Sequence, residues 1–189
     1  ALDLDGTALK DDHSMSNNTK DWIYRATEAG VTVIFATGRG IQTAGPVWEE
    51  LALNSPMVFV NGAEIWKGPG KLWKRHFIDR KDVRWLIQLA TDAGAWFWGY
   101  SAESLTKKDE WTPEMFERNW LKIGMRHRDL AVIAQLRETV KERETFEVFR
   151  SAPVNMEIAP KGISKATGVR HVCDYLGIGM EQVMAIGDN

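Results

Sequence analysis

Apolar and acidic residues alternate at the very start of the chain. Leu2 and Leu4 alternate with Asp3 and Asp5. A period of two is typical of a β-strand with one buried face, and side chains two residues apart on a strand point to the same side. We therefore predict a strand over 1–5 whose end carries two carboxylates that project together.

Helical and strand-like patterns then follow one another in a regular order. Ser16 is suited to cap a helix and Gly30 to end it. The run 31–36 is rich in β-branched and aromatic residues, as buried strands are. We predict a helix over 17–29, a strand over 31–36, a helix over 41–53 and a strand over 57–60. Strand and helix in alternation are typical of a parallel sheet.

This alternation of strands and helices is interrupted from about residue 66 and resumes near residue 163. The stretch 67–70 favours a hairpin turn. Beyond it we predict helices over 80–93 and 129–141 and strands over 95–100, 120–125, 146–150 and 154–158. A helix over 163–176 and a buried strand over 183–186 restore the parallel order. The fold class is therefore α/β: a Rossmann-like parallel-sheet core, residues 1–78 and 153–189, with an inserted α+β domain, residues 79–152.

Composition limits the partners of the protein. Hydrophobic residues make up 44% and charged residues 26% of 189 residues, with a net charge of −2, as in ordinary globular proteins. Neither a basic block nor an apolar run of roughly 20 residues occurs, so we expect no nucleic-acid or membrane partner. Cys173 is the only cysteine, which fits a reducing cytoplasm. The four histidines lack metal-ligand spacing, so we interpret them as structural or surface residues.

Polar residues follow three of the predicted core strands. Asp5, Thr37 and Asn61 all come at such ends. Ligands of parallel sheets bind outside the carboxyl ends of the strands, so we expect these polar residues to lie together at one edge of the sheet. Two adjacent carboxylates resist each other's ionisation, and a divalent cation relieves that repulsion. Each residue also has a plainer interpretation: an acidic turn for Asp3 and Asp5, and a helix N-cap for Thr37.

Four motifs in this order resemble the haloacid dehalogenase (HAD) superfamily, and in particular its Cof-type phosphatases with a C2-type cap. The first is Asp3-Leu4-Asp5-Gly6-Thr7 and the second is Thr37 in Phe-Ala-Thr-Gly-Arg. The third is Lys165 in Lys-Gly-Ile-Ser-Lys, and the fourth begins at Gly187-Asp188-Asn189. Alone, Lys165 would be a solvated helix residue and Asp188 a turn residue. The further acid of the fourth motif does not follow, and the chain begins inside a strand, so we expect a piece of a longer protein.

The resemblance implies a role for each residue. Asp3 would attack phosphorus and become an aspartyl-phosphate, while Asp5 would act as general acid and base. For that role Asp5 must be protonated near neutral pH, which crowding by Asp3 favours. Mg²⁺ would be held by Asp3, Asp188 and the backbone carbonyl of Asp5. The phosphoryl group would be bound by Thr37, Gly38 and Lys165.

The inserted domain would act as the cap that excludes water and selects the substrate. It is rich in tryptophan: seven of the nine lie between Trp66 and Trp120, and five of these are within 79–152. We expect Trp85, Trp96 and Trp98 to fill its core, and Trp111, in a polar loop, to contact substrate. Candidate substrate residues on the core loops are Arg39 and Asn61, which alternatively cap helices or tie loops together.

These observations predict a magnesium-dependent phosphohydrolase of small phosphorylated metabolites, with sugar phosphates expected as substrates. The alternatives are a phosphotransferase or phosphomutase of the same superfamily and a catalytically silent phosphosugar-binding protein. We expect a cytoplasmic monomer or homodimer.

Overall fold

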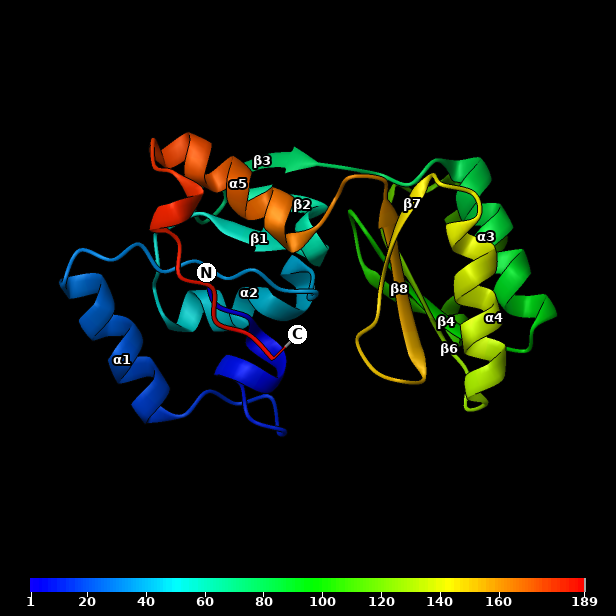
Figure 1. Ribbon diagram of the computed structural model, residues 1–189, viewed down its shortest axis with the longest axis horizontal. Helices are drawn as coiled ribbons and strands as arrows, with labels where there is room; N and C mark the ends of the chain where they lie inside the picture. Colours follow the sequence, from blue (N-terminus) through cyan, green and yellow to red (C-terminus); the bar gives the residue numbers. More distant parts are fainter. Residues whose placement is uncertain (189) are drawn as a thin grey trace. The chain divides into compact units, whose positions relative to one another are not determined.

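The computed structural model describes residues 1–188 and divides into two compact units (Figure 1). The first comprises Ala1–Lys74 and the segment from Lys165 onward, and the second comprises Arg75–Ser164. The strand Asn155–Pro160 lies in the sheet of the second unit, whereas the sequence-based division began the returning core segment at residue 153. Within the described residues, no helix is long and apolar enough to cross a membrane.

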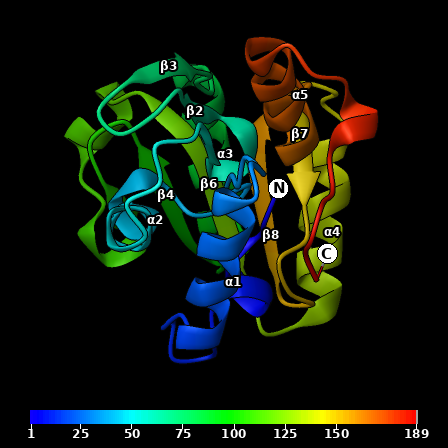
Figure 2. The same ribbon diagram turned by 90° about the vertical axis from the view of Figure 1, so that its left-hand side faces the viewer.

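Four segments of the first unit are joined in parallel. Leu2 is bridged to Phe35 on one side and to Ile186 on the other, and Ala36 is bridged to Val58. The hydrogen bonds follow a parallel ladder, for example from Leu2 N to Ile34 O and from Asp3 N to Ile186 O, both 2.9 Å. In Figures 1 and 2 the C-terminal segment accordingly runs beside the N-terminal one. The predicted parallel order is confirmed, with the N-terminal segment between the segments of Phe35 and Ile186.

Only one of these segments forms a regular strand, and it continues into a hairpin. β1 (Met57–Phe59) pairs antiparallel with β2 (Glu64–Trp66), which neighbours β3 (Leu72–Arg75). The turn between β2 and β3 closes with hydrogen bonds from Lys67 N to Lys71 O and from Lys71 N to Gly68 O. The predicted hairpin is therefore confirmed.

The helices of the first unit are α1 (Asn17–Glu28), α2 (Ile41–Glu50) and α5 (Lys165–Leu176). As predicted, the Ser16 side chain caps α1 by accepting from Thr19 N, and Gly30 follows its end at a φ of 86°. Trp22 of α1 is 60% exposed. Short single turns complete the unit at Leu4–Ala8, Val60–Gly62 and Met180–Gln182.

The predicted strand over 183–186 is not buried. Met184 is 74% and Ile186 is 52% exposed. In the part of the chain that the structure describes, this segment pairs with the N-terminal segment on one side only. Within the described residues it therefore forms an edge of the parallel ladder.

The second unit is a five-stranded antiparallel sheet with two helices on one face (Figure 1). The strand order is β5-β4-β6-β8-β7. The strands are β4 (Trp96–Ser101), β5 (Leu105–Lys107), β6 (Trp120–Arg126), β7 (Phe146–Phe149) and β8 (Asn155–Pro160). The helices are α3 (Arg80–Asp92) and α4 (Leu130–Lys141), and single turns lie at Lys108–Glu110 and Pro113–Glu117.

The core of the second unit lies between its helices and the sheet. Apolar residues at helical spacing on α3 and α4 meet every second residue of the strands, as the two periodicities require. The fully buried members include Leu86, Ala90, Val140, Ile123 and Ile158. The opposite face of the sheet therefore carries the other set of alternating residues.

Candidate active site

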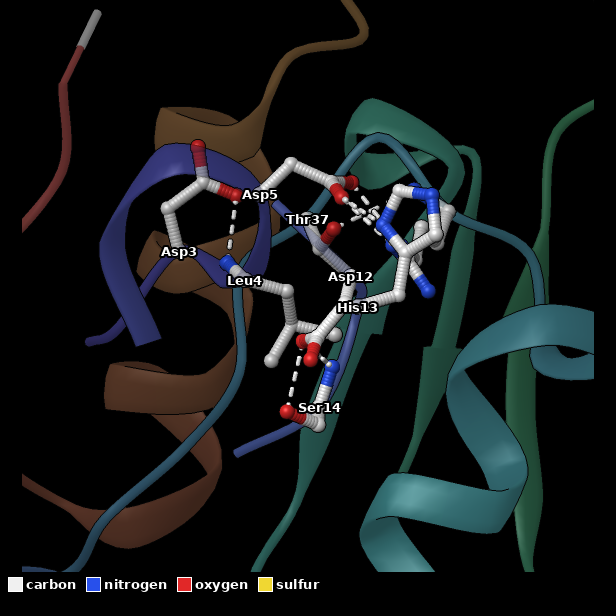
Figure 3. A network of polar contacts seen from close by, with 8 residues as sticks. Asp3, Leu4, Asp5, Asp12, His13, Ser14 and Thr37 are labelled. Carbon is white, nitrogen blue, oxygen red and sulfur yellow. Dashed lines mark hydrogen bonds and ion pairs between the residues drawn. The ribbon is translucent and has the colours of Figure 1, made fainter. Parts of the chain in front are cut away.

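The first motif is a wide turn rather than a continuing strand. Leu9 N donates to Leu4 O at 2.8 Å, and Gly6 adopts a φ of 70°, a conformation that glycine accepts without steric cost. The strand alternation therefore ends at Asp3, and the expectation that both carboxylates project together is wrong. Figure 3 shows Asp5 pointing toward His13 and away from Asp3.

Asp3 is buried and fully engaged by two donors. Its Oδ1 accepts from Leu4 N at 2.8 Å, and its Oδ2 lies 2.5 Å from the Nζ of Lys165. The two residues are 162 positions apart in the sequence. This ion pair holds the carboxylate in one orientation and balances its charge.

Lys165 is placed by the close approach of α5 to β1. A Cβ at Gly168, one turn further along α5, would overlap Val58 Cγ1 and lie 3.3 Å from the Cα of Gly62. No side chain fits there without displacement of the helix or of Val58. Glycine at position 168 thus lets the first residue of α5 reach Asp3.

Asp5 is bound by Arg39. Arg39 Nε donates to Asp5 Oδ2 at 2.8 Å and Nη2 donates to Oδ1 at 2.5 Å, while Nη2 also contacts His13 Nδ1 at 2.8 Å. The hydrogen bond from Arg39 lowers the pKa of Asp5 below its ordinary value, against the opposing effect of burial. The expectation that crowding by Asp3 keeps Asp5 protonated is therefore wrong for this arrangement, because Asp3 faces Lys165 and Asp5 faces a guanidinium.

Thr37 lies at the end of the second parallel segment and is completely buried. Its Oγ1 accepts from Arg39 N at 3.2 Å, and Gly38 lies between these two residues. Helix α2 begins after Gly40, which is its N-cap residue, so the interpretation of Thr37 as a helix cap is wrong. The Thr37 hydroxyl instead fixes the loop that carries Arg39.

The loop after β1 is strained and holds the Thr37 loop. Val60 and Asn61 have φ values of 53° and 55°, and a left-handed conformation is rare for a β-branched residue. Val60 N donates to Arg39 O at 2.9 Å, and Asn61 N donates to Thr37 O at 3.0 Å. Such strain persists where surrounding contacts over-determine it, typically at functional sites.

The expected magnesium ligands are all oxygen atoms: the carboxylates of Asp3 and Asp188 and the carbonyl of Asp5. A Cβ at Gly6 would lie 2.6 Å from Asp188 Oδ2, so this carboxylate rests against the first motif in space that only glycine leaves open. An oxygen-only donor set suits a hard cation such as Mg²⁺. Within the described part of the chain, no three His, Cys, Asp or Glu side chains are grouped around one point, so the set relies on the carbonyl.

Trp111 differs from its expected surroundings. Its ring stacks on Trp120 at 4.3 Å and meets Phe97 and Phe116 edge-on, so it packs against the core of the second unit. His13 is a surface residue, as we interpreted it, and it also contacts the Arg39–Asp5 pair. Nothing in the local sequence indicates this contact, because it spans 26 residues and depends on a turn at His13 with a φ of 64°.

The sequence and fold of the chain match known proteins. The profile of the haloacid dehalogenase-like hydrolases matches residues 1–129 and 103–189. The chain is 30% identical over 189 residues to the 5-amino-6-(5-phospho-D-ribitylamino)uracil phosphatase YcsE of Bacillus subtilis, and the match covers all of this chain and 76% of that protein.

Solved structures agree. A haloacid dehalogenase-like hydrolase from B. subtilis superimposes with a TM-score of 0.91 at 18% identity, covering 100% of this chain and 82% of that one. A HAD subclass IIB sugar phosphatase gives a TM-score of 0.80 at 16% identity, covering 97% of this chain and 77% of that one. These structures confirm the predicted α/β class. The chain therefore belongs to the haloacid dehalogenase-like hydrolase family, and it is a phosphatase of that superfamily.

Proposed function

We propose that this protein is a magnesium-dependent phosphohydrolase of small phosphorylated metabolites and that Asp3 is its nucleophile. The observation that carries the proposal is the Asp3–Lys165 ion pair at the carboxyl end of a parallel segment, together with the Asp188 carboxylate that rests against Gly6 of the same motif. A fixed carboxylate beside a single cation is suited to attack on a phosphorus atom whose oxygens need charge neutralisation.

In the first half of the reaction, an Asp3 carboxylate oxygen forms a bond to phosphorus while the bond from phosphorus to the ester oxygen breaks. Lys165 faces the same carboxylate and offers its charge to the phosphoryl oxygens. The Thr37 loop would border the phosphoryl group, with Gly38 as the residue that leaves most room. Water then attacks the aspartyl-phosphate, releases inorganic phosphate and restores Asp3.

Asp5 is the proposed general acid of the first half-reaction and the general base of the second. Because Arg39 stabilises the ionised form of Asp5, the carboxylate must separate from Arg39 before it can hold a proton for the leaving alkoxide. We therefore propose that the Asp5–Arg39 pair is a resting arrangement. Mg²⁺, when bound by Asp3, Asp188 and the Asp5 carbonyl, would neutralise negative charge between the nucleophile and the phosphate.

The relatives support a polyol or sugar phosphate as substrate. YcsE is named for a phosphate ester on a ribityl chain that is attached to an aminouracil ring. The structure with a TM-score of 0.80 is described as a sugar phosphatase. We propose that Arg75–Ser164 is the cap that selects among such compounds, and that the enzyme acts in the cytoplasm.

The test is phosphate release from a panel of sugar phosphates, ribitol 5-phosphate and nucleotides, with and without Mg²⁺. Asp3→Asn should reduce turnover to background and abolish the phosphoryl adduct on the peptide that contains Asp3. Asp12→Asn is the matched control, because Asp12 is an exposed acid of the same loop whose partner is Ser14. Retained turnover in Asp3→Asn would refute the covalent mechanism. Transfer to an added sugar instead of water would favour the phosphotransferase alternative.

A further inference from the structure

The face of the second unit's sheet that its helices leave uncovered carries two tryptophans that do not belong to the core. Trp96 and Trp98 lie two residues apart on β4 and therefore share this face. Trp96 is paired with Arg126 of β6, and Trp98 is paired with Lys107 of β5. The expectation that these two tryptophans fill the core is wrong, because Phe97 between them takes the core position.

These residues line a pocket of about 240 Å³ that lies wholly within the second unit. Its walls are Trp96, Trp98, Leu105, Lys107, Arg126 and Asn155. Pockets that enclose drug-sized ligands begin at roughly 300 Å³. A pocket of this size therefore accommodates a single ring rather than a whole cofactor.

The aromatic walls are held in place before any ligand binds. A Cβ at Gly124 would overlap the Trp98 ring, so that ring lies flat on the backbone of β6. The ring centroids of Trp96 and Trp98 are 5.5 Å apart and tilted by 33°, and Arg126 Cζ lies 5.1 Å from the Trp96 ring. Fixed rings and an adjacent guanidinium are the elements that bind planar π-systems.

The polar wall of the pocket is suited to a ligand that carries a hydrogen-bond donor. Asn155 is fixed through its main chain, since its N donates to Ala152 O at 3.1 Å and its O accepts from Arg137 Nη2 at 3.3 Å. Its side-chain Oδ1 is buried and has no partner within the described residues. An Asn155 amide turned toward the pocket would accept from a ligand N–H, while Lys107 and Arg126 would donate to carbonyl oxygens of the ligand.

We propose that this pocket binds the planar heteroaromatic ring of the substrate, a pyrimidine-like ring with ring N–H and carbonyl groups. The inference rests on the proposed phosphatase function, because the ring is taken to belong to the phosphorylated substrate. The same ring chemistry also occurs in separate small molecules, and the experiment distinguishes these two sources.

Binding is tested by calorimetry with 5-amino-6-(D-ribitylamino)uracil, which lacks phosphate, and with ribitol, which also lacks the ring. The wild-type protein should bind the first compound and not the second. Trp96→Leu should weaken binding about 5- to 100-fold, the usual effect of losing one stacking partner. Trp22→Leu is the matched control, because Arg25 Cζ lies at the same 5.1 Å from the exposed Trp22 ring on α1. No binding by the wild-type protein would overturn the proposal.

The source of the ring is tested by kinetics with the 5′-phosphate of the same uracil compound and with ribitol 5-phosphate. The ratio to compare is kcat/KM for the uracil phosphate divided by kcat/KM for ribitol 5-phosphate. Trp96→Leu should lower this ratio by the same factor by which it weakens binding, and Trp22→Leu should leave the ratio unchanged. An unchanged ratio despite lost binding would overturn the assignment to the substrate and point to a separate ligand. If Trp96→Leu lowers the melting temperature, Arg126→Met tests the same pocket from an exposed position. Failure of the wild-type enzyme to hydrolyse either phosphate would refute the proposed function and leave the calorimetric test valid.

Discussion

Substituting Gly6 by alanine tests whether the space beside the first motif is required for the Asp188 carboxylate. A Cβ at position 6 would lie 2.6 Å from Asp188 Oδ2 and 3.0 Å from its Cγ. Ordinary contact begins at 3.4 Å, so the carboxylate must retreat by about 0.8 Å. A misplacement of about 1 Å at a reacting centre can cost about 100-fold in rate. We therefore expect Gly6→Ala to raise the Mg²⁺ concentration for half-maximal activity, or to lower kcat, by about 10- to 100-fold.

Gly70→Ala separates this effect from backbone strain. Gly70 has a φ of 69°, almost the same as the 70° of Gly6, and no atom lies within 4 Å of the place that a Cβ at position 70 would take. Alanine in this conformation costs about 1–2 kcal/mol at either position, part of which is offset by the lower entropy of the unfolded chain. Both variants should therefore lose a few degrees of melting temperature.

The assay is phosphate release during a Mg²⁺ titration, with melting temperatures measured on the same samples. Only Gly6→Ala should change the metal dependence or kcat. If the two variants behave alike in both measurements, the carboxylate of Asp188 has no role beside the first motif, and its assignment to the metal site fails.

Two further predictions concern Asp5 and helix α5. Arg39→Gln should raise the pKa of Asp5, seen as a higher titration midpoint of its carboxyl carbon by NMR; an unchanged midpoint would refute the role of Arg39. Because the pKa of Asp5 is lowered in the folded state, the stabilisation from its pair with Arg39 is complete above the ordinary pKa of 3.8 and is lost as pH falls through the lowered pKa. The wild type should therefore lose more stability in acid than Arg39→Gln. Gly168→Ala should destabilise the protein by about 1–2 kcal/mol in urea unfolding, because overpacking against Val58 outweighs the roughly 1 kcal/mol gain in helix propensity. It should also lower kcat, because the displaced helix shifts Lys165. Adding Val58→Ala should recover part of both losses, and a Gly168→Ala variant more stable than wild type would contradict the close packing.

Local patterns in the sequence were sufficient for most of the elements. The Ser16 cap, the Gly30 stop and the hydrophobic periodicity of α3 and α4 depend on residues within a few positions of one another, so a single sequence reveals them. The order of strands and helices then predicted a parallel core, because connections between neighbouring strands leave few topologies open. The four motifs identified the family.

The directions of side chains were decided by tertiary structure. Asp5 turns away from Asp3 because Gly6 redirects the chain and Arg39, 34 residues away, offers two hydrogen bonds. Trp111 packs against the core and the Trp96–Trp98 pair lies on the uncovered face of the sheet, since strand alternation and the placement of the helices determine which face is buried. From the sequence alone we could name the candidate residues Asp3, Asp5, Thr37 and Lys165 and the approximate start of most strands and helices. Which of these residues contact one another was not predictable, because contacts between distant segments depend on backbone turns and helix packing that no local pattern encodes.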